Sequence, residues 1–390
     1  SPDALPIPIC AIPVSFIIVL TSAKSKFTVP VTAIKSDIPC TPCLNTSSAN
    51  LNESKRVVFL SAIDNNLSSF KKVSDDGIYE LQGAATCIDN STGNVVAIVG
   101  SRSQDDIDGY TLNRAYQSYR QPGSSIKPIV VYTPYLQQGN TPDTIVTDEK
   151  IDGGPNNADG SYAGQMTLRT AVMKSKNTVA WKIYRDDITP KMGIGFLLNM
   201  GFHKVWMDKN TNAVALGGFT YGVSTEEMAG AYATIANDGV YITPTFYTRV
   251  EDKDGNTVME PTQETRRVLS EGNAYILKSI LTGPIIGNDP TAPYCKISGQ
   301  DVGGKTGTTT NNYDRWFCGF TNYYTAATWY GFDQPENLYP AKANGTNRAA
   351  RLWVAVMKKV HSDLPSSKFE KPSNIVTAKI CKASGKVATD

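Results

Sequence analysis

Ser124 and Lys127 lie three positions apart in the stretch RQPGSSIKP and form a candidate pair of nucleophile and base. On a helix, positions i and i+3 share a face, so the serine hydroxyl and the lysine amine can share a hydrogen bond. Because an ordinary lysine has a pKa of about 10.4, Lys127 needs burial or a nearby second cation to serve as a base. The same spacing at Ser68 and Ser69, in the charged stretch SSFKKVSDD, predicts only surface residues.

The residues that flank Ser124 favour the start of a helix there. Gly123 permits a close approach of the backbone. Pro128 lacks the N–H group that would bond to the Ser124 carbonyl, which is tolerated only within about the first turn of a helix. The free N–H groups of a helix start would face the Ser124 region and could stabilise an oxyanion. We therefore expect Ser124 at a helix N-terminus.

A second candidate element is a hydroxyl and an amide, Ser175 and Asn177, separated by one residue in the stretch VMKSKNTVA. The hydroxyl can pass a proton, and the amide can hold a carbonyl or amide group of a substrate. Taken alone, such a pair is typical of a turn or a helix end, and it occurs again at Ser48 and Asn50.

The stretch GGKTGTTT offers groups that would complete such a site. Lys305 would be the second cation beside Lys127. Gly307 would let a substrate backbone pass close to a strand edge, and the hydroxyls of Thr306 and Thr308 could bind an anionic group. The N–H group of Thr308 could face an oxyanion. The P-loop spacing G-x-x-x-x-G-K-[ST] is not met, so the stretch does not predict a phosphate site.

The order S-x-x-K, S-x-N and K-T-G resembles the three-motif set of the penicillin-recognising serine enzymes. The chain resembles the transpeptidase domain of class A penicillin-binding proteins over about residues 77–360. The stretches that carry the resemblance are NRAYQSYRQPGSSIKP, GPNNADGSYAGQMTLRTAVMKSKN, ALGGFTYGVSTEEMAGAYATIANDGV and GGKTGTTTNNYDRWFCGFTNYYTAATWYGFD. The fold that this resemblance implies is α+β and β-lactamase/transpeptidase-like. It has a five-stranded antiparallel sheet with helices on both faces, an all-helical lobe, and the site between them.

The resemblance also implies a role for each motif residue. Ser124 is the acylated nucleophile, Lys127 its base and Ser175 a catalytic proton relay. The residues implied to bind the peptide come from the second and third motifs: Asn177, Lys305, Thr306, Gly307 and Thr308. The backbone N–H groups of Ser124 and Thr308 form the implied oxyanion hole. No metal and no cofactor are implied.

The implied reaction is peptidoglycan cross-linking by acyl transfer. Ser124 attacks the D-Ala-D-Ala bond of a stem peptide, D-Ala leaves, and an amine of a neighbouring strand takes the acyl group. Water can intercept the acyl-enzyme, which would give a D-Ala-D-Ala carboxypeptidase side activity. The implied partners are stem peptides that end in D-Ala-D-Ala, and β-lactam antibiotics that acylate the same serine as covalent inhibitors.

Three neighbouring functions share these motifs. A β-lactamase needs a positioned base for deacylation, and no E-x-x-x-N element stands between the second and third motifs. Glu226 and Glu227 lie instead in a helix-capping pattern and serve the helix. A carboxypeptidase differs from a transpeptidase only in its acceptor, which is water. A non-catalytic sensor of β-lactams would carry the same acylated serine without turnover on peptide.

The composition excludes several other classes of protein. Of the 390 residues, 41% are hydrophobic and 19% are charged, which is ordinary for a folded globular chain. The formal net charge is +2 without blocks of like sign, so no footprint for nucleic acid is present. The two histidines, His203 and His361, are too far apart in sequence to favour a Ser-His-Asp triad or a zinc site. We expect both to be ordinary loop or surface residues.

The seven cysteines leave the redox state of the chain open. Only Cys40 and Cys43 form a C-x-x-C pair, which lacks the second pair or the histidines that a structural zinc needs. The other five stand among apolar or small residues, and we expect buried small hydrophobes at Cys10, Cys87, Cys295, Cys318 and Cys381.

The pattern from Gly77 onward predicts mixed strands and helices that would position these groups. Residues 84–100 predict a hairpin around the turn NSTG. Residues 315–320 and 326–332 are rich in aromatic side chains and predict two antiparallel strands.

Three segments with helical spacing of apolar residues complete the prediction. Residues 164–175 form one candidate helix. Residues 224–239 form a second, which opens with a capping box from Ser224 to Glu227. Residues 270–283 form a third, which starts at Ser270 and stops at the Gly-Pro pair that begins at 283.

The distribution of glycine and proline marks a domain boundary. None of the 31 glycines occurs before Gly77, and seven of the 22 prolines lie in the first 50 residues. We expect residues 1–75 to be an accessory or linker segment, either the remnant of a preceding domain or a small module. Residues 76–365 are the expected penicillin-binding transpeptidase domain, and residues 366–390 a C-terminal extension.

The resemblance alone implies a location. Residues 4–23 carry no charge and are long enough to span a membrane, but their prolines disfavour a helix, so we expect extended strands there. No signal peptide is evident. Class A penicillin-binding proteins usually carry a glycosyltransferase domain, for which no motif is found here. The implied location is extracytoplasmic, on the outer face of the bacterial cell membrane, with anchoring through an N-terminal region missing from this chain.

Overall fold

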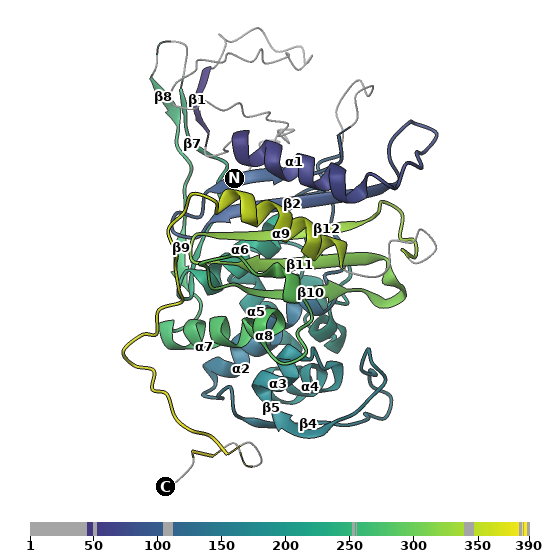
Figure 1. Ribbon diagram of the computed structural model, residues 1–390, viewed down its shortest axis with the longest axis vertical. Helices are drawn as coiled ribbons and strands as arrows, with labels where there is room; N and C mark the ends of the chain where they lie inside the picture. Colours follow the sequence, from purple (N-terminus) through teal and green to yellow (C-terminus); the bar gives the residue numbers. More distant parts are fainter. Residues whose placement is uncertain are drawn as a thin grey trace, which may run out of the picture.

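The computed structural model describes residues 45–49, 53–103, 112–251, 254, 256–338, 347–381, 384 and 386–387. Its centre is a five-stranded antiparallel sheet in the order β10-β11-β12-β2-β3 (Figure 1). The strands are β2 (Leu81–Asp89), β3 (Val95–Val99), β10 (Gly303–Thr308), β11 (Asp314–Phe320) and β12 (Tyr324–Phe332). The third motif therefore lies on an edge strand of the sheet.

Both predicted hairpins are confirmed. β2 and β3 pair antiparallel, and the Asp89 carboxylate stabilises the turn between them by accepting hydrogen bonds from the N–H (3.0 Å) and hydroxyl (2.6 Å) of Ser91. β11 and β12 pair antiparallel, with Trp316 opposite Trp329. Both indole side chains are buried, so the aromatic residues that favoured strands also fill the core.

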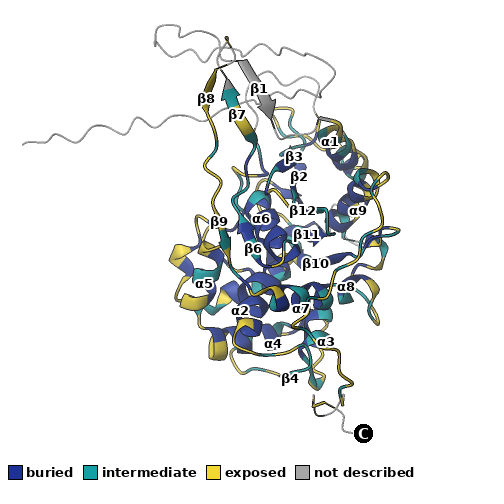
Figure 2. Ribbon diagram, turned by 90° about the vertical axis from the view of Figure 1, so that its left-hand side faces the viewer, coloured by how far each residue is buried: buried dark blue, intermediate teal, exposed yellow. Residues whose placement is uncertain are grey.

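Helices cover both faces of this sheet. α6 (Thr225–Ala236) packs against one face. α1 (Glu53–Leu67) and α9 (Arg348–Val360) pack together on the opposite face, as Figure 2 shows. Phe59 and Ile63 of α1 are fully buried against the sheet. A helix from the segment 1–75 thus contributes to the core of the sheet domain.

A second lobe lies below the sheet in Figure 1 and is helical apart from one two-stranded sheet, in which β4 (Ile145–Asp148) pairs with β5 (Gly164–Thr167). Its helices are α2 (Thr133–Gln137), α3 (Leu168–Met173), α4 (Asn177–Lys182), α5 (Pro190–Leu198), α7 (Glu271–Leu281) and α8 (Gly283–Ile286). The expected α+β arrangement of a five-stranded antiparallel sheet, helices on both faces and a helical lobe is present.

The three helix predictions differ in how well their ends were placed. α6 carries the predicted capping box between Ser224 and Glu227. α7 starts after Ser270, whose hydroxyl accepts from the Asn273 N–H, but Gly283 does not stop the helical path, because α8 begins there. Residues 164–167 are strand β5 and not helix, because they pair with β4.

Short helical turns and peripheral strands complete the described chain. The turns are η1 (Gly123–Ile126), η2 (Pro128–Tyr132), η3 (Ile183–Ile188), η4 (Trp206–Asp208), η5 (Asn212–Leu216), η6 (Pro293–Cys295) and η7 (Thr310–Asn312). The peripheral strands are β1 (Asn45–Ala49), β6 (Val240–Ile242), β7 (Tyr247–Glu251), β8 (Thr257–Met259) and β9 (Thr265–Arg267). β1, β7 and β8 form one small sheet, and β6 pairs with β9.

Two predictions about single residues are wrong. His361 is not a surface residue, because it is buried at the end of α9. Its ring contacts the Thr321 hydroxyl (2.8 Å) and the Met357 carbonyl (2.7 Å). Cys381 is exposed, because the C-terminal segment lies on the surface. His203 is exposed as expected.

The remaining cysteines divide by location. Cys87, Cys295 and Cys318 are buried, as predicted. Cys10, Cys40 and Cys43 lie outside the described residues, as do the predicted strands of residues 4–23. Among the helices of the described ranges, none has the length and hydropathy that a membrane crossing needs.

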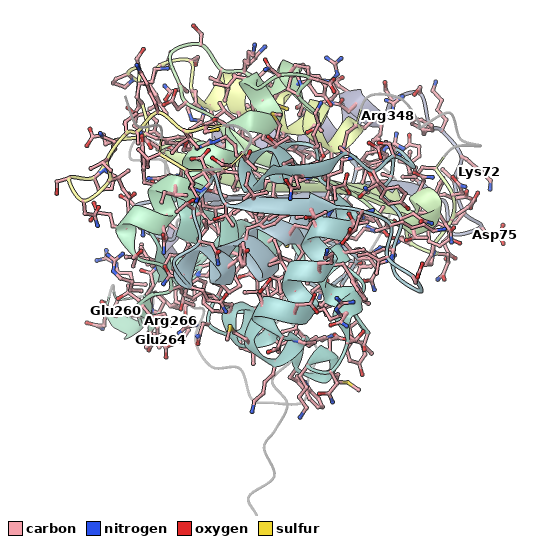
Figure 3. The ribbon with its side chains drawn as sticks, turned by 90° about the horizontal axis from the view of Figure 1, so that it is seen from below. Lys72, Asp75, Glu260, Glu264, Arg266 and Arg348 are labelled. Atoms are coloured by element: carbon pink, nitrogen blue, oxygen red, sulfur yellow. The ribbon has the colours of Figure 1, made fainter. Side chains whose placement is uncertain are left out.

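Charged side chains of both signs lie at the rim of the molecule (Figure 3). At one edge Glu264 and Arg266 form an ion pair of 3.0 Å, and at the opposite edge lie Lys72 and Asp75. The presence of both signs at these edges agrees with the low net charge of +2.

Candidate active site

The three motifs, far apart in sequence, meet between the sheet and the helical lobe. η1 opens a helical run that continues through η2 into α2, and Ser124 stands in its first turn, as expected. The Lys127 N–H donates to the Ser124 carbonyl. Pro128 is tolerated because it is the first residue of η2. Ser124 is partly exposed, whereas Gly123, Ser125 and Ile126 are buried.

Three glycines let η1, the turn that carries Ser124 and is called the nucleophile turn below, fit between β10 and the end of η5. A Cβ atom on Gly123 would lie 2.4 Å from the Thr308 carbonyl oxygen, and one on Gly217 would lie 2.4 Å from the Gly123 nitrogen. A Cβ atom on Gly307 would lie 2.3 Å from the Pro122 carbonyl oxygen. Gly307 therefore makes room for the nucleophile turn itself, a reason that the sequence did not reveal.

Lys127 joins the first motif to the second. Its side chain is wholly buried, and its Nζ atom contacts the Ser175 carbonyl oxygen (2.8 Å), the Ser175 hydroxyl (3.5 Å) and the Asn177 Oδ1 atom (2.7 Å). Burial lowers the pKa of Lys127 well below its ordinary value, and the charge of Lys305 lowers it further. Both conditions for a lysine base are therefore met.

Lys305 lies on β10 and is also wholly buried. Its Nζ atom donates to the Thr306 carbonyl oxygen at 3.1 Å. Burial lowers the pKa of Lys305 to about 7. Because side chains alternate along a strand, Lys305 and Gly307 point to the buried side of β10, whereas Thr306 and Thr308 point to its more exposed side, where a substrate can reach their hydroxyls. The two threonines therefore do not join the lysine cluster.

Ser175 reaches Lys127 through a left-handed backbone turn. It follows α3 with φ of +57°, and its N–H donates to the Val172 carbonyl oxygen at 3.0 Å. A serine with positive φ is uncommon and marks a backbone that its surroundings hold in place. The turn brings the Ser175 carbonyl and hydroxyl toward the amine of Lys127.

The Ser124 hydroxyl makes no hydrogen bond within the described part of the chain. A neighbouring serine, which sequence analysis passed over, holds the turn instead: the Ser125 hydroxyl donates to the Pro122 carbonyl oxygen at 2.7 Å. From α6, the Tyr232 hydroxyl donates to the Ser125 carbonyl oxygen at 2.6 Å. The turn is thus fixed through Ser125, and the Ser124 hydroxyl takes no part in holding it.

β10 lies at the edge of the sheet, paired with β11, so its outer edge can take up an extended peptide. The register places Arg315 of β11 opposite Thr308. The Arg315 guanidinium donates to the Thr308 hydroxyl and to the Asn312 side chain. Sequence analysis missed Arg315, although counting the register of the hairpin back from the third motif would have found it.

A groove of about 550 Å³ opens beside the nucleophile turn. Its lining combines glycines from three loops with the side chains of Gln121, Trp181, Tyr313 and Asp314. The Asp314 carboxylate forms an ion pair of 2.8 Å with Arg120, so the groove wall is close to neutral there. Within the described residues, no group of three metal-ligating side chains gathers.

This geometry can perform acyl transfer. A free serine hydroxyl stands at a helix start, a lysine with a lowered pKa lies one turn away, and the N–H groups of Ser124 and Thr308 come from two segments in close approach. Such an arrangement provides a nucleophile, a base and candidate donors for an oxyanion.

Comparison with known families identifies one domain. Residues 83–355 match the family described as "Penicillin binding protein transpeptidase domain". The chain is 35% identical over 329 residues to "Penicillin-binding protein 1A" of Clostridium acetobutylicum, covering 80% of this chain and 40% of that protein. It is 33% identical over 263 residues to "Penicillin-binding protein 4" of Bacillus subtilis, covering 66% of this chain and 41% of that protein. The chain thus spans about two fifths of the length of these curated relatives.

Solved structures show the same fold. Penicillin-Binding Protein 1A from Haemophilus influenzae aligns with a TM-score of 0.74 at 21% identity, covering 88% of this chain and 70% of that one. The PonA1 protein from Mycobacterium tuberculosis, solved in complex with penicillin V, aligns with a TM-score of 0.70 at 23% identity. That alignment covers 85% of this chain and 89% of the other.

Proposed function

Since the chain belongs to the penicillin-binding protein transpeptidase family, we propose that it is a peptidoglycan DD-transpeptidase. It cross-links stem peptides through a serine acyl-enzyme and is inhibited by β-lactams. The observation that carries this proposal is the buried Lys127 amine, which contacts Ser175 and Asn177. The nearby charge of Lys305 lowers the pKa of this amine further.

The first half of the reaction forms the acyl-enzyme. Ser124 Oγ attacks the carbonyl carbon of the D-Ala-D-Ala peptide bond while its proton passes to the neutral Nζ atom of Lys127. The carbonyl oxygen becomes an oxyanion, which the N–H groups of Ser124 and Thr308 stabilise. The C–N bond then breaks. The leaving amine of D-Ala takes the proton from Lys127 through the Ser175 hydroxyl, and an ester of Ser124 remains.

The second half reverses these roles. The amine of a neighbouring stem peptide attacks the ester carbonyl and gives up a proton to the Ser175 and Lys127 relay. The C–O bond breaks, Ser124 Oγ takes the proton back, and the new amide leaves as the cross-link. When water attacks in place of the amine, the product is a free acid, which is the carboxypeptidase side activity.

The substrate lies along the outer edge of β10. Backbone hydrogen bonds of an extended peptide follow residues 305–308, and the Asn177 side chain binds a peptide amide. The hydroxyls of Thr306 and Thr308 bind the terminal carboxylate, beside the Arg315 guanidinium that donates to Thr308. A positive group at this point suits an anionic chain end.

Of the two glutamates considered for a β-lactamase, Glu227 is engaged elsewhere. The Glu227 carboxylate accepts hydrogen bonds from the N–H groups of His203 (2.8 Å) and Ser224 (2.8 Å), so it serves as a helix cap. Burial raises the pKa of its neighbour Glu226 to about 7. Both belong to α6 and its start, which favours the transpeptidase over an enzyme that hydrolyses β-lactams rapidly.

The proposal includes a division of the chain. Residues 76–365 together with α1 (Glu53–Leu67) are the transpeptidase domain, the rest of residues 1–75 is an accessory or linker segment, and residues 366–390 are a C-terminal extension. The packing of α1 argues for counting its residues with the domain. Anchoring to the outer face of the bacterial cell membrane, through a region that precedes this chain in a longer protein, is supported by the greater length of the relatives.

The test is product analysis with a stem pentapeptide ending in D-Ala-D-Ala, with and without an acceptor amine such as glycine. We expect release of D-Ala and, with the amine, a product in which the amine replaces D-Ala. Release of D-Ala with only the hydrolysed peptide would indicate a carboxypeptidase. No release from a protein that a penicillin still acylates would indicate a sensor.

A further inference from the structure

A loop that carries none of the three motifs holds the second motif in place. It connects β4 to β5 and spans residues 149–163. Asp148, the last residue of β4, is wholly buried. Its carboxylate accepts hydrogen bonds from three donors: the Thr178 hydroxyl (2.5 Å), the Asn157 Nδ2 atom (2.6 Å) and the Ala163 N–H (2.9 Å).

Lys176, between the serine and asparagine of the second motif, belongs to the same network. It is buried and forms ion pairs with Asp148 (3.1 Å) and Asp159 (3.0 Å). Burial alone would raise the pKa of Asp148, but its hydrogen bonds and Lys176 together lower it. A buried carboxylate whose hydrogen bonds are all made resists rearrangement, because loss of one partner would leave a buried charge uncompensated.

Asn157 connects the buried ion pair of Asp148 and Lys176 to the start of α4. Its Nδ2 atom donates to Asp148 and to the Ser161 carbonyl oxygen (2.8 Å). Its Oδ1 atom accepts from the N–H groups of Asn177 (2.7 Å) and Thr178 (3.3 Å), which begin α4 and have no partner within the helix. The N-cap position of α4 offers no capping side chain, so Asn157 caps the helix from another segment.

The residue before it orients the Asn177 side chain. The Asn156 carbonyl oxygen accepts a hydrogen bond of 2.9 Å from Asn177 Nδ2. This contact identifies the amine end of the amide, so the carbonyl end, Oδ1, is the one that faces Lys127 at 2.7 Å. Asn156 and Asn157 therefore hold both the backbone and the side chain of Asn177.

We propose that Asn157 is a positioning residue, which holds Asn177 so that the Asn177 carbonyl stays on the Lys127 amine. The buried pair of Asp148 and Lys176 fixes Asn157 in turn. This inference rests on the proposed function, in which Lys127 is the base. It adds a structural support that none of the three motifs contains.

The test is the rate of acylation by a fluorescent penicillin for Asn157→Ala, measured across pH on the folded protein. We expect acylation at least about tenfold slower, because the Asn177 carbonyl no longer stabilises the ammonium that forms as Lys127 takes the Ser124 proton. The Asn177 carbonyl stabilises the charged form of Lys127, so loosening it lowers the pKa of Lys127. The acidic limb of the rate profile then moves to lower pH. Lys305, the charged group that acts on Lys127, is untouched by this substitution.

Asn90→Ala is the matched control. Asn90 is as buried as Asn157, at 4% against 5% exposure, and its side chain bonds to Thr321 (2.9 Å) and Thr325 (2.6 Å) at the far end of β2. We expect this variant to lose stability without a change in the acylation profile. In an Asn177→Ala background, Asn157→Ala should cost little more, because it acts through the missing side chain.

If Asn157→Ala does not fold, Asn157→Asp decides the question. Its carboxylate still accepts from α4 but meets Asp148, so the two share a proton at low pH and repel as it is lost. The acylation rate relative to wild type should therefore fall as pH rises. A flat ratio near one, or a slow Asn157→Ala with an unmoved acidic limb, overturns the inference. Failure of the wild type to be acylated overturns the proposed function instead.

Discussion

Lys127 and Lys305 are both wholly buried and unusual in having lowered pKa values at one site. Burial disfavours the charged form of each, and the charge of Lys305 disfavours the charged form of Lys127. Two such groups lose their protons in coupled steps. Both effects favour the neutral form of the Lys127 amine, three positions along the chain from Ser124.

Replacement of Lys305 by glutamine tests this coupling. Removal of the neighbouring charge raises the pKa of Lys127. Because only the deprotonated amine is a base, the acidic limb of the acylation rate against pH moves to higher pH. The rate at pH 7 falls about tenfold or more, since a cationic side chain that can stabilise negative charge is lost from the site. The measurement is the rate of acylation by a fluorescent penicillin across the pH range.

Lys204→Gln is the control for this prediction. Lys204 is exposed, and its Nζ atom lies 3.9 Å from the centre of the Tyr119 ring, on the outside of the molecule. Its loss should leave the acidic limb where it is. An acidic limb that stays in place, or moves to lower pH, in Lys305→Gln would contradict the role of Lys305.

At the level of single residues, the sequence could reveal the motif residues, because Ser124 with Lys127 and Ser175 with Asn177 are recognised by their local spacing. It could not reveal Asn157, which meets Asn177 from 20 positions earlier through a loop of its own. Nor could it reveal what Gly307 avoids, since the nearest atoms belong to Pro122. Contacts between segments that are far apart in the sequence produce no motif with a recognisable spacing.

Among the elements, α1 is the one whose importance sequence analysis underrated. Its fifteen residues, ESKRVVFLSAIDNNL, lack glycine and have one aromatic residue, so they were grouped with the accessory segment. In the structure they cover the sheet together with α9. Hairpins and capped helices were predictable because their signals are local, whereas the start of α8 and the extent of β5 depend on neighbouring segments.

Phe59→Ala measures what α1 contributes. Phe59 is fully buried between α1 and the sheet, so we expect the free energy of unfolding to fall by about 3–5 kcal/mol. Val57→Ala, at a position 48% exposed on the same helix, should change it by less than about 0.5 kcal/mol. Chemical denaturation gives both values. Equal, small effects would place α1 outside the cooperative core.

Across the whole molecule, the C-terminal segment ties α9 back to the sheet near the site. The Ser367 N–H donates to the Gly299 carbonyl oxygen (3.0 Å), and Lys368 pairs with Asp301 (3.0 Å). The Phe369 ring packs 5.6 Å from the ring of Phe320. Gly299 and Asp301 lie just before β10 in sequence, and Phe320 ends the neighbouring β11, so the segment supports the edge strand that carries Lys305.

Removal of residues 366–390 should lower the melting temperature by a few degrees, as expected for loss of about 1–2 kcal/mol from a protein of this size. Thermal unfolding followed by circular dichroism is the measurement. Removal of residues 382–390 alone is the control, since it leaves the contacts of residues 367–369 intact. A melting temperature equal in both truncated proteins would show that this segment does not support the sheet.

The most direct test of the central claim is the intact mass of the protein after incubation with benzylpenicillin. Wild type should gain the mass of one penicillin and keep it, and Ser125→Ala should do the same, because Ser125 only holds the turn. Ser124→Ala should gain nothing. An adduct on Ser124→Ala, or an unmodified wild type beside intact penicillin, would contradict the assignment of Ser124 as the acylated nucleophile.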